Sequence, residues 1–150
     1  MSSAGICGFV RSPFTQANKG ALAKTRPDDI LATVIKGLIA KTGVKPADVE
    51  DVIIGTAFPE GEQGFNIGRM VALMAGLPET VSGATVNRWC GSSMEAIHIA
   101  AGKIANGAGD VFICGGVESM TRIPIGGYNP LPNPALYKNY PQVYMSMGLT

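Results

Sequence analysis

The chain has 150 residues, and 12 Lys and Arg against 11 Asp and Glu give it a formal net charge of +1. This balance leaves no long-range basic field, so nucleic acid is not expected as a partner. Hydrophobic residues make up 46% of the chain and charged residues only 15%, which is typical of a deeply buried α/β protein. No apolar run approaches the length of a membrane helix, and no basic stretch precedes an apolar one at the N-terminus. We therefore expect neither a membrane span nor a secretory signal.

Cysteine usage bears on the compartment and on metal binding. The chain has three Cys, an odd number, and their spacing shows no pairs. This pattern indicates a reducing compartment and predicts no metal site. The cytoplasm is the expected location, with the mitochondrial matrix after removal of a transit peptide as the alternative.

The first part of the chain predicts a strand followed by a helix. Residues 6–10 form an apolar run that ends at Ser12 and Pro13, so we expect a buried strand there. Residues 16–26 suit an exposed loop or a short helix. Pro27 and the two acids after it then open a helix, which Gly43 closes.

Two further strands and one helix are predicted in the middle of the chain. Residues 49–54 suit the second strand, and residues 58–64 a loop. Asn66 is a candidate cap for a helix over residues 67–76. Residues 84–87 suit the third strand.

The next helix, over residues 90–107, is apolar around most of its circumference. Only Glu95, His98 and Lys103 interrupt the apolar pattern. Such a helix is buried on several sides, so we expect it to lie between two sheets. Residues 110–116 supply a fourth strand. Alternating strands and helices predict a mostly parallel sheet with right-handed crossovers.

The composition changes after Arg122. From Ile123 onward the chain holds five of its ten Pro, all four Tyr and a single charge, Lys138. Residues 126–134 carry too many Gly and Pro for a helix or a central strand. We therefore divide the chain into residues 1–122 and residues 123–150. Taken alone, the second segment is typical of a disordered tail.

Cys90 is the candidate nucleophile. It lies where a strand pattern meets a helix pattern, and its neighbours are polar or small. At the N-terminus of a helix, free backbone N–H groups and the macrodipole stabilise a thiolate. Cys7 and Cys114 lie inside apolar runs instead, which is typical of buried structural cysteines.

The segment around Cys90 resembles the N-terminal active-site signature of the thiolase family. The sequence Val-Asn-Arg-Trp-Cys-Gly-Ser-Ser-Met-Glu-Ala over residues 86–96 is similar to the form found in degradative 3-ketoacyl-CoA thiolases. Residues 10–14, 114–120 and 147–150 resemble further segments of that family in the same order and spacing. The resemblance therefore spans the whole chain.

The resemblance implies a layered αβαβα fold with a mostly parallel sheet. Residues 1–122 would be part of the first half, and residues 123–150 would begin a loop domain that covers the acyl-CoA channel. The family's catalytic His, its second catalytic Cys and the Asn that orders an oxyanion-hole water lie in the other half. We therefore expect a C-terminal half as partner, present as further polypeptide or as a separate chain.

The resemblance also implies a reaction. Cys90 would form an acyl-thioester while the enzyme cleaves a 3-ketoacyl-CoA with CoA to acetyl-CoA and a shortened acyl-CoA, or runs the reverse condensation. The backbone N–H of Cys90 would bind the oxyanion, and Met147 would line the acyl pocket. Ser146 replaces a His found in many short-chain biosynthetic thiolases, which favours a broader degradative substrate range. No cofactor beyond the substrate coenzyme A is implied, and the assembly would be a homodimer or tetramer.

Two alternatives stay open. One is a related 3-ketoacyl synthase, which also uses a Cys at a strand–helix junction. The other is a catalytically silent fragment or scaffold subunit that binds a partner chain. No general base is evident in this chain, since His98 lies about 12 Å from Cys90 along the helix axis and does not match the family's catalytic His.

Other polar groups have structural interpretations. Arg69 and Arg88 could meet a CoA phosphate, but we expect structural pairing. Gly115 and Gly116 suit a tight strand exit rather than a phosphate loop, because no nucleotide-binding motif accompanies them. Glu118 and Ser119, in the segment that follows, are interpreted as structural.

Overall fold

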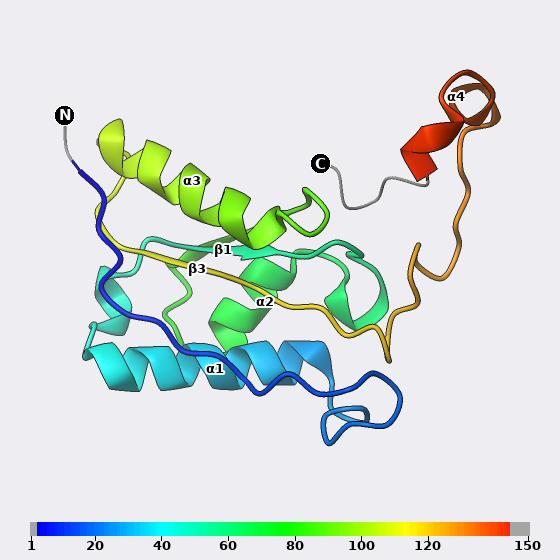
Figure 1. The fold of residues 1–150 in the computed structure, drawn as a ribbon. Coiled ribbons are helices and arrows are strands. Elements are labelled where there is room, and N and C mark those ends of the chain that lie inside the picture. Colours follow the sequence, from blue (N-terminus) through cyan, green and yellow to red (C-terminus); the bar gives the residue numbers. More distant parts are fainter. Residues whose placement is uncertain (1–2, 145–150) are drawn as a thin grey trace.

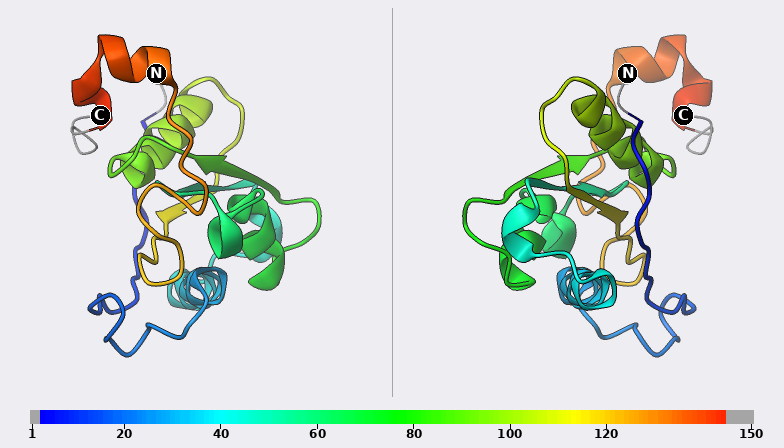
Figure 2. Two further views of the ribbon diagram at one scale, coloured as in Figure 1. Left: turned by 90° about the vertical axis from the view of Figure 1, so that its right-hand side faces the viewer. Right: turned by 90° about the vertical axis from the view of Figure 1, so that its left-hand side faces the viewer.

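The computed structural model describes residues 3–144, which form a three-layered body with an extended C-terminal arm (Figure 1). Two helices cover one face of a small sheet and one helix covers the other face, as the two side views show (Figure 2). The elements are α1 (Pro27–Thr42), β1 (Asp51–Gly55), α2 (Ile67–Met74), β2 (Ser82–Val86), α3 (Ser92–Ala105), β3 (Phe112–Gly116) and α4 (Pro134–Asn139). Short 3₁₀ turns occupy Pro46–Asp48, Gly61–Gln63 and Pro141–Tyr144.

The sheet is parallel, as the alternating pattern predicts. Its order is β2-β1-β3, with Ile53 of β1 opposite Ala84 of β2 and Cys114 of β3. Strands covered by helices on both faces read as continuous apolar runs. In β1, Val52, Ile53 and Ile54 are accordingly fully buried. The sheet thus confirms the predicted α/β class.

Both ends of α1 and the start of α2 lie where local sequence signals place them, whereas α2 ends at Met74, two residues before the predicted end. Pro27 is the first residue of α1, and Gly43 closes the helix with a φ of 69°. Such a left-handed conformation carries little penalty only for Gly. The side chain of Asn66 caps α2 by accepting a hydrogen bond from the Arg69 N–H at 3.4 Å. The cap supplies one of the partners that the first turn of a helix lacks.

The strand expected at residues 6–10 is not formed. The segment is extended, but it belongs to no ladder, and Ile6 and Phe9 are each 77% exposed. A groove of about 930 Å³ runs between the N-terminal segment (residues 4–15) and β3, with apolar side chains of α1 and α3 along it. An isolated segment cannot form a strand without a neighbour to pair with, and among residues 3–144 the only strand that pairs with β3 is β1. Residues 16–26, whose sequence suits an exposed loop or a short helix, form turns.

Helix α3 begins at Ser92, two residues later than predicted, and only one of its faces is covered. Ala96 and Ala100 pack on Ile53 of β1. Met94 is 58% exposed and Ile97 is 36% exposed. The expected burial on several sides is therefore not met within the described residues, which supply three layers of the fold.

Residues 123–128 still contact the layered body, since Ile123 is 1% exposed and the Tyr128 N–H donates to the Glu60 carboxylate at 2.6 Å. Beyond them the chain runs out to the short helix α4 (Figure 1). No helix or strand interrupts residues 126–133, in line with their Gly and Pro content. Asn133 caps α4 by accepting a hydrogen bond from the Ala135 N–H at 2.9 Å. The division into two domains remains a prediction. Among residues 3–144, no helix combines the length and hydrophobicity needed to cross a membrane.

Candidate active site

Cys90 lies in the turn between β2 and α3, directly before Gly91, the N-cap of α3. Its side chain is exposed. Cys114 on β3 is half-buried, and its Sγ donates to the Ala96 carbonyl at 3.4 Å. Cys7 was expected to be buried as well, but it is exposed because the N-terminal segment does not join the sheet. Cys90 is therefore an exposed cysteine at the N-terminus of a helix.

Gly55 and Gly116, at the carboxyl ends of β1 and β3, allow the first turn of α3 to lie close to the sheet. A Cβ built on Gly55 would lie 2.5 Å from the Ser93 nitrogen, closer than such atoms approach one another. A Cβ on Gly116 would collide with the Ser93 hydroxyl. The strand exit expected at Gly115 and Gly116 is thus a contact site for the first turn of α3.

Side-chain hydrogen bonds fix the turn that carries Cys90, the candidate nucleophile. We define this nucleophile turn as residues 87–92. The Asn87 Oδ1 accepts from the Trp89 N–H at 2.9 Å, and the Ser92 hydroxyl donates to the Trp89 carbonyl. The Ser92 Oγ also accepts from the Arg88 N–H at 2.8 Å. Trp89 has a φ of 48°. A bulky residue adopts this conformation only where its surroundings enforce it, and such strain is concentrated at functional sites.

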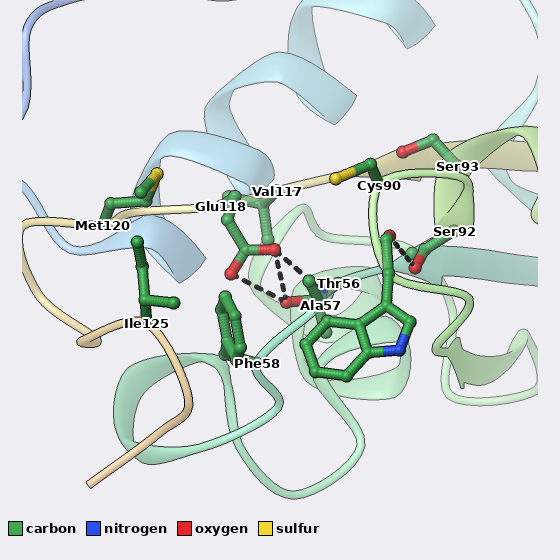
Figure 3. A pocket seen from close by; sticks show the side chains of 12 residues that line it. Thr56, Ala57, Phe58, Cys90, Ser92, Ser93, Val117, Glu118, Met120 and Ile125 are labelled. Atoms are coloured by element: carbon green, nitrogen blue, oxygen red, sulfur yellow. Dashed lines mark hydrogen bonds between the residues drawn. The ribbon is translucent and has the colours of Figure 1, made fainter. Parts of the chain in front are cut away.

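A pocket of about 340 Å³ opens beside Cys90 (Figure 3). Its lining is mostly apolar and comes from the ends of β1 and β3, the nucleophile turn and the start of the C-terminal arm. The lining residues are Gly55, Thr56, Ala57, Phe58, Trp89, Cys90, Ser92, Ser93, Val117, Glu118, Met120 and Ile125. A mostly apolar cleft with a few polar groups is the usual form of a small-molecule site.

The sequence pattern does not identify Phe58 or Glu118 as members of the site, whereas Trp89 lies within the segment that resembles the active-site signature. The ring of Phe58 meets the ring of Trp89 edge-on, with centroids 5.5 Å apart. Glu118 crosses the pocket to the loop after β1, where its Oε2 accepts from the Ala57 N–H at 2.7 Å. One signal was available, because the carboxyl ends of neighbouring parallel strands meet at one edge of the sheet. Residues that follow β1 and β3 therefore belong near Cys90.

The other candidate residues do not gather at Cys90. Met147 lies outside the described residues. His98 is exposed on α3 and does not line the pocket. The Arg69 guanidinium donates to the backbone carbonyls of Glu79 and Val81. These two bonds give Arg69 the expected structural role.

Arg88 pairs with Glu95 on the first turn of α3, and the two side chains approach to 3.4 Å. This ion pair agrees with the structural pairing expected for Arg88. Within the part of the chain that the structure describes, no three His, Cys, Asp or Glu side chains cluster in a way that could hold a metal ion. That the protein needs no metal or cofactor remains a prediction.

The fold and the site together define an α/β protein with an exposed cysteine where a parallel strand leads into a helix. Comparison with known families specifies the class further. The protein-family model described as "Thiolase, N-terminal domain" matches residues 4–149. The chain belongs to the thiolase family.

Individual relatives agree with this assignment. The 3-ketoacyl-CoA thiolase of Bacillus subtilis (strain 168) is 45% identical over 150 residues, which is 100% of this chain and 38% of that protein. The 3-ketoacyl-CoA thiolase of Saccharophagus degradans is 45% identical over 146 residues, or 97% of this chain and 37% of the relative. The chain thus spans well under half the length of these curated relatives.

A solved structure shares the fold. The crystal structure of the Bacillus anthracis acetyl-CoA acetyltransferase matches with a TM-score of 0.73 and 38% sequence identity. The match covers 79% of this chain and 30% of that one. The layered arrangement of helices and parallel strands described above is therefore the N-terminal part of a thiolase fold.

Proposed function

We propose that this chain supplies the nucleophilic part of a 3-ketoacyl-CoA thiolase, an acetyl-CoA C-acyltransferase. The observation that carries the proposal is the placement of Cys90. It is exposed, it directly precedes the N-cap of α3, and it lines an apolar pocket. The names of the two curated relatives support the same reaction class.

The proposed reaction proceeds through a thioester on Cys90. The thiolate attacks the keto carbon of a 3-ketoacyl-CoA, and the backbone N–H of Cys90 helps to bind the oxyanion that forms. The bond between the α and β carbons then breaks, and its electron pair leaves on acetyl-CoA, which takes up a proton. The thiol of a second CoA loses its proton and attacks the thioester, which releases the shortened acyl-CoA and restores the Cys90 thiolate. The reverse sequence is the Claisen condensation.

The chain requires a second polypeptide region for this chemistry. His98 does not line the Cys90 pocket, so the proton transfers depend on groups outside the described residues. The uncovered apolar face of α3 and the groove beside β3 are surfaces that a C-terminal half would cover. Soluble monomers rarely expose contiguous apolar patches larger than a few hundred Å².

We expect the complete enzyme to be a homodimer or a tetramer. Strand β2 lies at the edge of the sheet, and its outer side has no neighbouring strand among the described residues. Unpaired edges of this kind favour pairing with another chain. Light scattering on the active particle tests this expectation, which a fully active monomer would contradict.

The proposed location is the cytoplasm, and the substrate is a fatty acyl chain undergoing β-oxidation. The three cysteines are free in the structure, which fits a reducing compartment. The mitochondrial matrix is the alternative. Cell fractionation with an antibody to this chain distinguishes the two compartments, and thiolysis rates on a series of 3-ketoacyl-CoA lengths test the substrate class.

A second candidate function is that of a catalytically silent scaffold subunit, and the absence of His98 from the pocket favours it. A third is a related 3-ketoacyl synthase. Two assays separate all three: thiolysis of acetoacetyl-CoA and of a longer 3-ketoacyl-CoA, and condensation in the reverse direction. Both are run on the chain alone and after co-production with the C-terminal remainder of the Bacillus subtilis relative. A thiolase needs the second polypeptide and cleaves the substrates, whereas a scaffold cleaves neither in either case and a synthase only condenses.

A further inference from the structure

Glu118, which follows β3, joins the exit of that strand to the loop after β1 at the Cys90 pocket. Its carboxylate accepts hydrogen bonds from the Ala57 N–H at 2.7 Å and from the Gln63 amide at 2.6 Å. The Thr56 hydroxyl approaches the same carboxylate at 3.4 Å. All three partners belong to the loop after β1, which we define as residues 56–63. The carboxylate therefore fastens this loop to the exit of β3 (Figure 3).

Gln63 makes the junction rigid. Its side chain is fully buried, and its amide nitrogen also donates to the Phe58 carbonyl at 3.0 Å. Its Oε1 accepts from the Ser119 N–H at 2.7 Å. A buried amide costs free energy unless its polar atoms are bonded, so this position selects a group that donates on one side and accepts on the other. Gln63 and Glu118 thus form one connected network.

The loop after β1 also braces the nucleophile turn. The Asn87 amide donates to the Ala57 carbonyl at 2.9 Å. The ring of Phe58 packs edge-on against Trp89. Ala57 and Phe58 are therefore held by Glu118 and Gln63 from one side and contact the nucleophile turn on the other.

We propose that Glu118 and Gln63 are positioning residues for Cys90. They act through Ala57 and Phe58, which keep Trp89 in its left-handed conformation and so aim the Cys90 side chain and backbone N–H into the pocket. Glu118 is not the base of the reaction, because both carboxylate oxygens already accept hydrogen bonds from fixed donors. Its effect on kinetics depends on the proposed thiolase function, whereas its effect on Cys90 geometry does not.

The test compares variants in the chain co-produced with the C-terminal remainder of the Bacillus subtilis relative. In Glu118→Gln, an amide nitrogen faces either the Ala57 N–H or the Gln63 amide, so one bond becomes a contact between two donors. We expect kcat to fall roughly 10- to 100-fold with KM little changed, because the loss is one of orientation. The rate of Cys90 alkylation by iodoacetamide should fall in parallel. Glu60→Gln is the matched control, since Glu60 binds the Tyr128 N–H instead.

A compensating variant separates positioning from general folding. Gln63→Glu alone places two carboxylates side by side. Gln63→Glu/Glu118→Gln restores one donor and one acceptor between the two side chains, although the bond from residue 63 to the Phe58 carbonyl is still lost. The double variant should therefore alkylate faster than Gln63→Glu, which lacks both contacts. If Glu118→Gln fails to fold, Glu118→Asp keeps the charge but shortens the reach, and an alkylation rate below that of the wild type is expected.

Two outcomes would overturn the proposal. One is a wild-type alkylation rate in Glu118→Gln, or in Glu118→Asp where that variant replaces it; a lower kcat beside this unchanged alkylation would assign Glu118 to the substrate. The second is a double variant that alkylates no faster than Gln63→Glu. If the wild-type complex lacks thiolysis but Cys90 alkylation still depends on Glu118, the proposed function fails and the positioning role stands.

Discussion

The ring of Phe58 contacts the ring of Trp89 edge-on at a centroid distance of 5.5 Å, which joins the loop after β1 to the turn that carries Cys90. Edge-on packing is a favoured arrangement of two aromatic rings. Phe58 is only 9% exposed. The contact therefore supports Trp89 from the side of the sheet and belongs to the framework around Cys90.

Phe58→Leu should weaken this framework without removing a polar group. We expect a loss of about 1 to 2 kcal/mol in the free energy of unfolding, from the lost ring contact and a small cavity. In the complete enzyme kcat should fall more than KM changes, because the turn loses a support. Urea denaturation and thiolysis kinetics measure the two effects. An unchanged kcat beside the expected loss of stability would show that the ring contact is not needed for catalysis.

Gly55→Ala should displace the start of α3. The added Cβ would lie 2.5 Å from the Ser93 nitrogen, which is backbone and cannot rotate away. We expect a cost of about 1 to 3 kcal/mol and a severe loss of activity, because Cys90 precedes this turn.

Gly37→Ala in α1 is the matched control for Gly55→Ala. Nothing lies within 4 Å of its Cβ position, so the change should stabilise the helix by up to about 1 kcal/mol. Equal effects of the two substitutions on thermal unfolding would contradict the close approach of α3 at Gly55.

The local part of the fold is readable from the sequence. Pro27, Gly43 and Asn66 set helix ends through contacts with their own neighbours, and the structure has these ends where the pattern predicts them. The strand at residues 6–10 is different, because a strand exists only by pairing with another. The apolar run at residues 6–10 would be buried only if a neighbouring strand paired with it. None of the described residues provides such a strand, and a groove lies between this segment and β3 instead.

The site likewise contains one residue that the local sequence identifies and others that depend on contacts distant in sequence. Cys90 is identifiable because a strand pattern, a cysteine and a helix pattern follow one another directly. Phe58 and Glu118 are far from Cys90 in sequence and meet it only because β1 lies between β2 and β3. The predicted parallel sheet places the residues that follow its strands at one edge, but the strand order is not encoded in any local window, so the sequence does not single out Phe58 and Glu118.

The three thiols should differ in reactivity. Burial, together with the negative charge of Asp51, raises the pKa of the Cys114 thiol to about 11. At neutral pH Cys114 is therefore almost entirely protonated, and its labelling should rise about tenfold for each pH unit up to that pKa. Brief iodoacetamide treatment of the complete enzyme near neutral pH should label Cys90 first, as peptide mapping would show. Preferential labelling of Cys7 or Cys114 would refute the assignment of the nucleophile.

Acid should destabilise the chain through Glu62, which bridges two arginines. The hydrogen bond and charge of Arg122 lower the pKa of the Glu62 carboxyl, although partial burial opposes the shift, and the charge of Arg26 lowers it further. Because the pKa is lower in the folded state, the stabilisation is present above the usual carboxyl pKa of about 4.3 and disappears as the pH falls below it.

Glu62→Gln should therefore lose less stability than the wild type when the pH is lowered from about 5 to about 3. Chemical denaturation at a series of pH values measures this difference. Glu79→Gln, at an exposed position in the turn before β2, serves as the control and should follow the wild type. Parallel curves for Glu62→Gln and the wild type would contradict the role of this ion pair.

The central claim is that Cys90 carries the acyl group. The most direct measurement is to mix the chain, co-produced with the C-terminal remainder of the Bacillus subtilis relative, with acetoacetyl-CoA, quench the mixture in acid and map the peptides by mass. The account predicts an acetyl group on the peptide that contains Cys90, and none on this peptide in Cys90→Ser. An acetyl group on another residue, or an active enzyme that retains thiolysis with Cys90→Ser, would contradict it.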